Sequence, residues 1–431
     1  MKRDFLRRDV ARMRGSCARL VAATLLTIIS FAGVSAELPE VASGAAEGWA
    51  VSGFGTLGLA YHTERDTQFR RSFDQGEGAR AGRLDAGVDS LFGLQLNRRL
   101  GEDWSAMVQV VARKDAEGDW APKLSWGFVK YVPDNWMEIR VGRLTTDIYL
   151  DGDSRHIGYA YAGVRPIPDI YGRLAFDTFD GVDASFFSPL GSGMLKFKLY
   201  GGRTRGESYV HDHVYRFDHG RTLGSTLEWL SPEWTLRLAW GRMQNPHDHS
   251  LDPFRGVLRA ASDALGPVLG AQLAARAGEI DTRSEITFTG FGVGWDRGPV
   301  SLQLVGAEFA YNSFPDFEGW ALGVTAAYRL GAWKPYVSYS KSVLAGDPRP
   351  LALPPGLERL QATYDGISRR LDQDQHAIGV GVRYDFAENA ALKLQLDQIR
   401  AKRSSMLLDG EGMAVGPRSF SVMSVALDFV F

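Results

Sequence analysis

The strongest constraint on the fold of this chain is an alternation of apolar and polar side chains with a period of two residues. Within residues 392–397, three leucines alternate with Lys393, Gln395 and Asp397. The same pattern recurs at residues 92–99 and 195–200. Successive side chains of a strand point to opposite faces, so each segment predicts a strand with one apolar and one polar face. The sequence therefore indicates an all-β protein.

About sixteen segments of this kind follow one another. They lie near residues 50–62, 91–100, 104–113, 123–132, 136–145, 181–188, 193–204, 221–230, 234–243, 285–296, 299–311, 319–330, 333–343, 375–387, 390–401 and 419–431. Tight turns, such as residues 101–103 and 231–233, alternate with long polar loops. Short turns at one rim and long loops at the other are typical of a transmembrane antiparallel up-and-down β-barrel. About sixteen strands would leave an aqueous lumen, and an even number allows the ends to pair.

Aromatic residues support the same fold class. Trp104, Trp136, Trp234 and Trp333 each begin a predicted strand directly after a short turn. Indole rings prefer the boundary between lipid and water, so this band predicts an aromatic girdle at the periplasmic rim. In a soluble β protein the same residues would be ordinary core aromatics.

The amino-terminal segment has the pattern of a secretory signal. Basic residues precede the apolar run 20–31, and Val34, Ser35 and Ala36 offer small residues for a peptidase. We expect residues 1–36 to be removed, leaving residues 37–431 as a single barrel domain. No later stretch reaches the ~20 apolar residues of a spanning helix, so we expect no helical anchor.

Charge and cysteine content narrow the function classes. The formal net charge is -2, which gives no reason to expect a nucleic-acid partner. The single cysteine, Cys17, lies in the predicted signal, so neither disulfides nor thiolate metal sites are expected in the mature chain. Among the long loops, residues 256–278 predict a short helix packed on the barrel mouth and interrupted at Gly266-Pro267.

Three segments resemble the Gram-negative general porins. Residues 52–61, SGFGTLGLAY, look like the opening strand of that family. The ending VALDFVF, residues 425–431, is similar to its terminal strand with a C-terminal phenylalanine. Residues 177–189 resemble the strand that follows the constriction loop. Together with the alternation of strands and loops, the resemblance covers nearly the whole mature chain.

The resemblance implies a homotrimer of sixteen-stranded barrels, each a water-filled channel for passive diffusion of small polar or charged solutes, with no cofactor. It implies contact with outer-membrane lipid and lipopolysaccharide, and recognition of Phe431 as an assembly signal by the barrel-assembly machinery. The third extracellular loop, here residues 146–180, would fold into the lumen as the constriction. The family's usual Pro-Glu-Phe-Gly-Gly motif is absent from this loop.

Two sets of charged residues are candidates for the ion selectivity of such a pore. On the loop, the predicted constriction residues are Asp147, Asp151, Asp153, Arg155, Arg165 and Asp169. On the strands, alternation places a second set on the lumen face: Arg113, Glu138, Arg140, Lys196, Lys198 and Arg237. This wall is mainly basic and would oppose the acidic start of the loop, giving a transverse field across the pore. The alternative is that these side chains are solvated lumen residues away from the constriction.

Two other functions remain open from the sequence alone. An outer-membrane barrel enzyme of the lipase or protease type would need serine, histidine and a carboxylate together, and His376 lies near Asp372 and Asp374 without a recognised nucleophile. A secreted β-rich ligand-binding protein is the other alternative. Histidines in two predicted external loops, at 211–219 and 247–249, offer a weak metal signal, for which polar solvated loops are the simpler explanation. We therefore predict no metal site.

Overall fold

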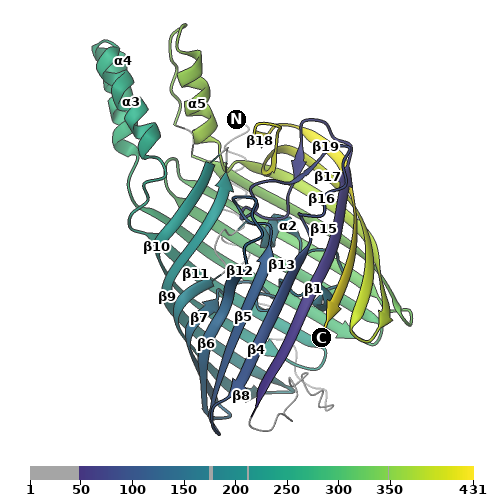
Figure 1. Ribbon diagram of the computed structural model, residues 1–431. Coiled ribbons are helices and arrows are strands. Elements are labelled where there is room, and N and C mark those ends of the chain that lie inside the picture. The colour runs from purple at the N-terminus through teal and green to yellow at the C-terminus, as the bar shows by residue number, and fades with distance from the viewer. Residues whose placement is uncertain (1–47, 174–177, 211–212, 348) are drawn as a thin grey trace.

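A computed structural model describes residues 48–173, 178–210, 213–347 and 349–431. In this part of the chain, sixteen long strands form one closed antiparallel barrel (Figure 1). They are β1 (Trp49–His62), β4 (Leu91–Arg99), β5 (Trp104–Arg113), β6 (Lys123–Asp134), β7 (Met137–Thr145), β8 (Thr178–Leu190), β9 (Gly193–Val210), β10 (His213–Leu230), β11 (Trp234–Asn245), β12 (Ser284–Arg297), β13 (Val300–Asn312), β14 (Phe317–Tyr328), β15 (Trp333–Gly346), β16 (Gln373–Ala387), β17 (Ala390–Leu408) and β19 (Arg418–Val430). The predicted fold class is confirmed, and each of these strands overlaps one predicted segment.

The barrel is closed by the pairing of its first and last strands. β1 pairs with β19 from Phe54 opposite Val430 to His62 opposite Val422. Beyond the last strand, Gly53 and Phe431 exchange two backbone hydrogen bonds, with N···O distances of 2.8 and 3.0 Å. Closure satisfies the backbone groups of both edges, which would otherwise be exposed to hydrocarbon without partners.

The outer surface of the barrel is apolar, as a membrane requires. Leu392, Leu394 and Leu396 are each more than one third exposed, whereas Lys393 between them is fully buried inside the barrel. The predicted girdle tryptophans are also exposed on the outside, and Trp104 and Trp333 stack on Tyr131 and Tyr384 with ring centroids 4.4 and 4.3 Å apart. Apolar side chains outside and polar ones inside match the inverted alternation of an outer-membrane barrel.

Shorter elements decorate the loops. They are β2 (Gln68–Phe69), β3 (Ala79–Arg80), β18 (Ala414–Val415), the 3-10 turn η1 (Gly158–Ala160), α2 (Pro168–Tyr171), α3 (Asp252–Ala264), α4 (Pro267–Glu279) and α5 (Glu358–Ser368). Among the described residues, no helix is long and apolar enough to cross a membrane.

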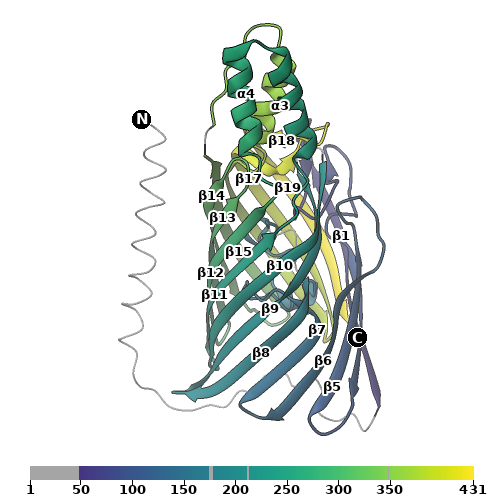
Figure 2. The same cartoon turned by 90° about the vertical axis from the view of Figure 1, so that its left-hand side faces the viewer.

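The predicted interrupted helix is the hairpin of α3 and α4, with the break at Gly266 because Pro267 begins a new helix. The hairpin does not lie down on the barrel mouth. It projects from the rim beside α5 (Figures 1 and 2). Leu258 and Leu273 of the hairpin pack in one apolar cluster with Tyr364 of α5. The helices therefore bury their apolar faces against one another, which the sequence did not indicate.

The predicted signal and one predicted external loop differ in how the structure bears on them. The predicted signal, residues 1–36, lies outside the described residues. The segment predicted as an external loop around residues 211–219 is instead a strand hairpin, since His213 pairs with Val210 across residues 211–212. β9 and β10 therefore extend beyond the positions predicted from alternation.

Candidate pore constriction

The described part of the connection between β7 and β8, residues 146–173, lies inside the barrel. It includes η1 and α2, and α2 is seen within the ring of strands in Figure 1. Side chains of this loop contact lumen-facing residues of β9, β15 and β17. The loop therefore crosses the lumen.

The first anchor of the loop is a buried ion-pair cluster at Asp147. Its carboxylate accepts hydrogen bonds from Lys198 of β9, at 2.5 Å, and from Arg237 of β11. Arg237 also pairs with Glu228 of β10. The side chains of Asp147 and Lys198 are 2% and 1% exposed. Charges buried to this degree need close partners, so the cluster holds the start of the loop against the wall.

An aromatic contact continues this anchor. The ring of Tyr149 meets Phe288 of β12 edge to face, with centroids 5.4 Å apart. Further along the loop, Ile167 and Ile170 lie above Gly323 of β14, where a Cβ would come within 2.7 Å of each isoleucine. A glycine in the strand therefore lets the loop approach the wall closely.

Two carboxylates of the loop are held by neutral donors. Asp169 accepts hydrogen bonds from the hydroxyls of Ser340 and Ser342, at 2.6 and 2.9 Å, and from the amide of Gln375 at 2.9 Å. Burial raises the pKa of the Asp169 carboxyl, and the serine hydroxyls oppose that rise. Asp151 accepts a hydrogen bond from Gln303 of β13 at 2.5 Å. Both residues fix the loop to β13 and β15 rather than facing the basic wall.

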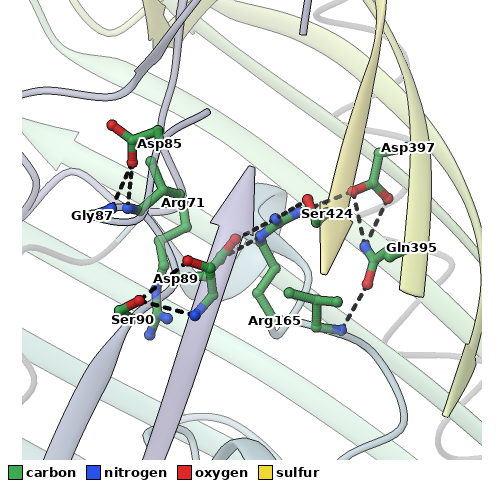
Figure 3. A network of polar contacts seen from close by, with 12 residues as sticks. Arg71, Asp85, Gly87, Asp89, Ser90, Arg165, Gln395, Asp397 and Ser424 are labelled. Carbon is green, nitrogen blue, oxygen red and sulfur yellow. Dashed lines mark hydrogen bonds and ion pairs between the residues drawn. The ribbon is translucent and has the colours of Figure 1, made fainter. Parts of the chain in front are cut away.

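On the opposite wall, Arg165 makes the most extensive polar contacts of the loop (Figure 3). It donates two hydrogen bonds to Asp89, at 2.7 and 2.5 Å, and one to Asp397 of β17 at 2.9 Å. It also donates to the hydroxyl of Ser424 in β19 at 2.5 Å. A bidentate guanidinium–carboxylate pair fixes both distance and orientation. Arg165 therefore ties the loop to both sides of the barrel closure.

A third anchor uses carbonyl groups of the loop. Lys393 of β17 donates to the carbonyls of Gly158 and Gly163, at 2.6 and 2.8 Å, and pairs with Asp428 of β19 at 2.9 Å. Arg383 of β16 donates to the carbonyl of Tyr159 at 2.5 Å. The loop is irregular here, so its carbonyl groups do not pair with a neighbouring strand. The side chains of Lys393 and Arg383 supply the hydrogen-bond donors instead.

The wall formed by β6–β9 remains more accessible to solvent. Arg143 pairs with Asp180 at 2.7 Å, and these side chains are 28% and 41% exposed. Arg140 forms a buried bidentate pair with Asp183. Lys196 is partly exposed, and Asp153, on the loop, is exposed and interacts electrostatically with Lys196. Charged groups that remain in contact with water are therefore concentrated on this side.

The other charged residues that the sequence predicted to line the pore do not form one cluster. Arg113 pairs with Asp74 of the first external loop, and Glu138 lies 3.6 Å from both Arg140 and Lys130. Nε of Arg155 lies 3.3 Å from Nε2 of His156 within the loop. Asp153, Arg140, Lys196, Lys198 and Arg237 share one electrostatic neighbourhood. Arg165 and Asp169 lie elsewhere, and Asp151 is bound to Gln303 while also interacting electrostatically with Arg237.

The expectation of a mainly basic wall is wrong. Four carboxylates share the lumen face with the basic residues, namely Asp183, Glu228, Asp397 and Asp428. Three of the four pair with a strand residue: Asp183 with Arg140, Glu228 with Arg237 and Asp428 with Lys393. An unpaired charge facing low-dielectric surroundings is costly, so basic and acidic residues occur together. Strand parity applied to the carboxylates could have found all four.

The first external loop also enters the barrel mouth, which the sequence did not indicate. Arg70 is buried and donates to the carbonyls of Ser405, Met406 and Tyr209, at 2.8, 2.8 and 2.6 Å. Gly172 of the constriction loop packs on this segment, where a Cβ would lie 2.2 Å from the carbonyl oxygen of Arg71. Two loops therefore support each other above the lumen.

Metal binding finds no geometric support in the described part of the chain. No group of three or more histidine, cysteine or carboxylate side chains in it is arranged to hold a metal ion. His249 contacts Asp252 at 2.8 Å, as expected for a helix start rather than a metal site.

Comparison with known proteins agrees with this geometry. No curated protein matches the chain. Among solved structures, the anion-selective porin from Comamonas acidovorans is 14% identical, with a TM-score of 0.51 over 89% of this chain and 100% of that chain. OmpF of Salmonella typhi, solved with daunomycin, is also 14% identical, with a TM-score of 0.51 over 89% and 97%. The channel DcaP of Acinetobacter baumannii is 12% identical, with a TM-score of 0.50 over 89% and 97%.

At these identities the solved structures establish the fold alone. The sequence itself establishes the family, because the family model of the Gram-negative porins matches residues 22–404, which is most of the chain. A closed sixteen-stranded barrel with an apolar exterior and a charged interior is the architecture of that family. The chain belongs to the Gram-negative porin family and is an outer-membrane channel protein.

Proposed function

We propose that solutes pass between residues 151–157 of the loop and the wall of β6–β9, and that Asp153 and Lys196 set the ion preference there. The observation that carries this proposal is the contrast in solvent access. Asp153 is exposed and Lys196 is partly exposed, whereas Asp147 and Arg165 are buried at contacts that hold the loop. Only a charge that faces the water path acts directly on a passing ion.

Asp153 and Lys196 carry opposite charges on opposite sides of this path. Asp153 belongs to the loop, and Lys196 belongs to β9, where its ammonium lies 5.7 Å from the ring centroid of Phe187. Opposite charges across a narrow aqueous passage produce a transverse field that orients dipolar solutes. Asp147 contributes to the same field but is already paired with Lys198 and Arg237.

Reversal potentials in planar bilayers under a salt gradient test this assignment. Asp153→Asn removes a negative charge from the path, so we expect a shift toward anions. Lys196→Gln should shift the preference toward cations. Screening at physiological salt extends over about 8 Å, so a charge on an outer loop should have little effect. Glu117→Gln, on the external surface, is the matched control, and unchanged reversal potentials in both pore variants would contradict the proposal.

We further propose that the channel has no catalytic function. The candidate His376 lies on β16 next to Gln375, whose amide reaches Asp169 inside the barrel, so His376 points outward. Asp372 pairs with Arg403 at 2.6 Å, and Asp374 pairs with Lys402 at 3.0 Å. A catalytic triad needs a carboxylate that orients the histidine and a serine within reach. These engaged carboxylates do not favour a barrel enzyme.

The assembly and its partners are likewise proposals. We propose a homotrimer, as the resemblance to general porins implies, with outer-membrane lipid around the apolar belt and lipopolysaccharide at the outer rim. Phe431 is 58% exposed at the end of the closing strand, where the barrel-assembly machinery could bind it. Its ring stacks beside Phe92 and Phe429, with centroids 6.3 and 6.5 Å apart.

A further inference from the structure

A second cavity lies near the extracellular mouth, apart from the proposed water path. It has room for water over about 80 Å³, well above the roughly 10–15 Å³ that one water molecule needs. Its apolar wall comes from Phe73 of the first external loop, Tyr215 and Phe217 of β10, and Ile286 of β12. At its base lies Arg173, at the end of the described part of the constriction loop.

Arg173 is in an unusual state for an arginine. The residue is 2% exposed, and Nε, Nη1 and Nη2 are all buried with no hydrogen-bond acceptor among the residues that the structure describes. Its guanidinium lies between the rings of Phe73 and Phe309, 5.7 and 5.5 Å from their centroids. Cation–π contacts compensate only part of the cost of removing a guanidinium from water. The nearby carboxylate of Asp169 interacts electrostatically with Arg173 but forms no ion pair with it among the described residues, so the guanidinium can accommodate an anion.

Two neutral groups of the same cavity are also buried. The hydroxyl of Ser284 has no hydrogen-bond partner among the described residues, and the hydroxyl of Tyr311 lies beside the Arg173 guanidinium without a well-formed bond to it. Both residues line the cavity together with Arg173. Buried polar groups are normally hydrogen-bonded, so such side chains around one cavity indicate a ligand or ordered water.

The other charged residues of the cavity already have partners. Arg370 donates to the carbonyls of Phe314 and Ile367, at 2.6 and 2.9 Å. Asp248 accepts from the backbone of Ser250, and Glu285 accepts from Arg242. Asp169, which interacts electrostatically with Arg173, is already held by Ser340, Ser342 and Gln375. The Arg173 guanidinium therefore remains available to a ligand, while the carboxylates around it would repel additional negative charge. The cavity is suited to a monoanion rather than to phosphate.

We propose that this cavity binds a monocarboxylate with an apolar or aromatic body. The carboxylate accepts hydrogen bonds from Arg173, with Tyr311 and Ser284 as additional donors. The apolar body packs against Phe73, Phe217 and Ile286. Charge-assisted hydrogen bonds to a guanidinium are among the strongest available in a protein, and apolar walls add affinity for an aromatic ring. This binding is independent of the route proposed for permeation.

Calorimetry of the full mature protein in detergent tests the proposal, with sodium benzoate as the probe and benzamide as its neutral counterpart. We expect saturable binding of benzoate and at least about tenfold weaker binding of benzamide, because the amide carries no charge. Arg173→Gln should weaken benzoate binding to a similar extent. Arg216→Gln is the matched control, because Arg216 is exposed and pairs with Glu117 and Glu207 outside the cavity.

A second variant guards against misfolding of Arg173→Gln. Tyr311→Phe removes one oxygen and keeps the ring, so its barrel should retain the gel shift on heating while benzoate binds several-fold more weakly. No saturable benzoate binding by the wild type would overturn the proposal. So would equal binding by Arg173→Gln, or a preference for inorganic phosphate over benzoate. Benzoate binding by a protein that conducts no ions would leave this site intact and refute the proposed pore.

Discussion

At the scale of single residues, the lumen shows a division between charges that hold the loop and charges that face water. Asp147 and Arg165 are buried and have several partners each, so their main effect is to fix the loop. Asp153, six residues from Asp147, is exposed. The same residue type in one short segment therefore serves two purposes, according to its burial.

This division makes a prediction for Asp147→Asn. The change leaves Lys198 and Arg237 buried with a neutral partner, which costs on the order of 3–5 kcal/mol when a buried pair is broken. We expect the loop to detach, giving a noisier single-channel current and a lower temperature of the gel shift on heating. Asp153→Asn is the control and should leave that temperature unchanged. Equal heat stability and current noise in the two variants would refute the anchoring role of Asp147.

At the scale of elements, the closure of the barrel depends on glycines that face aromatic rings. A Cβ at Gly53 would lie 2.3 Å from the Phe431 ring, and a Cβ at Gly55 would lie 2.4 Å from the Phe429 ring. Rings lying over glycines of a neighbouring strand fill space that the missing side chains leave open, and they help to fix the strand register. The opening and closing segments of the sequence therefore fit each other physically.

The closure predicts that Gly53→Val and deletion of Phe431 both reduce the yield of folded barrel in the outer membrane. Valine would push the Phe431 ring out of its place, and the deletion removes both the ring and the two terminal hydrogen bonds. Outer-membrane yield, measured with the gel shift on heating, checks both. Gly410→Val is the matched control, because a Cβ there meets no atom within 4 Å. Wild-type yield for both closure variants would contradict this account.

At the scale of the whole molecule, the constriction loop connects walls that the barrel itself keeps apart. It contacts β9 and β11 through Asp147, β15 through Asp169, and β17 and β19 through Arg165. The barrel supplies a rigid frame, since every strand pairs with two neighbours. We therefore expect the loop, and not the number of strands, to set the width of the proposed water path.

Replacing residues 152–163 by a short glycine-serine linker should raise the single-channel conductance. The anchors at Asp147 and Arg165 remain, while the segment beside the proposed water path is removed together with the carbonyls of Gly158 and Gly163 that Lys393 holds. Conductance in planar bilayers provides the measurement, and the gel shift on heating confirms that the barrel is folded. An unchanged conductance in a folded variant would show that this segment does not limit the flow of ions.

The closed barrel and the proposed homotrimer can each be tested by gel electrophoresis. Closed barrels protect their ladder hydrogen bonds, so unheated protein should migrate differently from boiled protein on a denaturing gel. Chemical crosslinking of protein in outer-membrane vesicles should yield a trimer. Crosslinking that produces only monomer would contradict the trimer and leave the channel itself unaffected.

The barrel follows from the amino-acid sequence, because the alternation of side chains is a local property of each strand and closure follows from pairing neighbours along the chain. The sequence therefore predicted the sixteen strands, the lumen face of Lys198 and Arg237, and the girdle tryptophans. The tertiary structure alone decided which loop charges are buried, since Asp147 meets Lys198 and Arg165 meets Asp397 across long sequence separations. It also placed the Arg173 guanidinium between the rings of Phe73 and Phe309, because a loop has no repeating pattern that fixes the direction of its side chains.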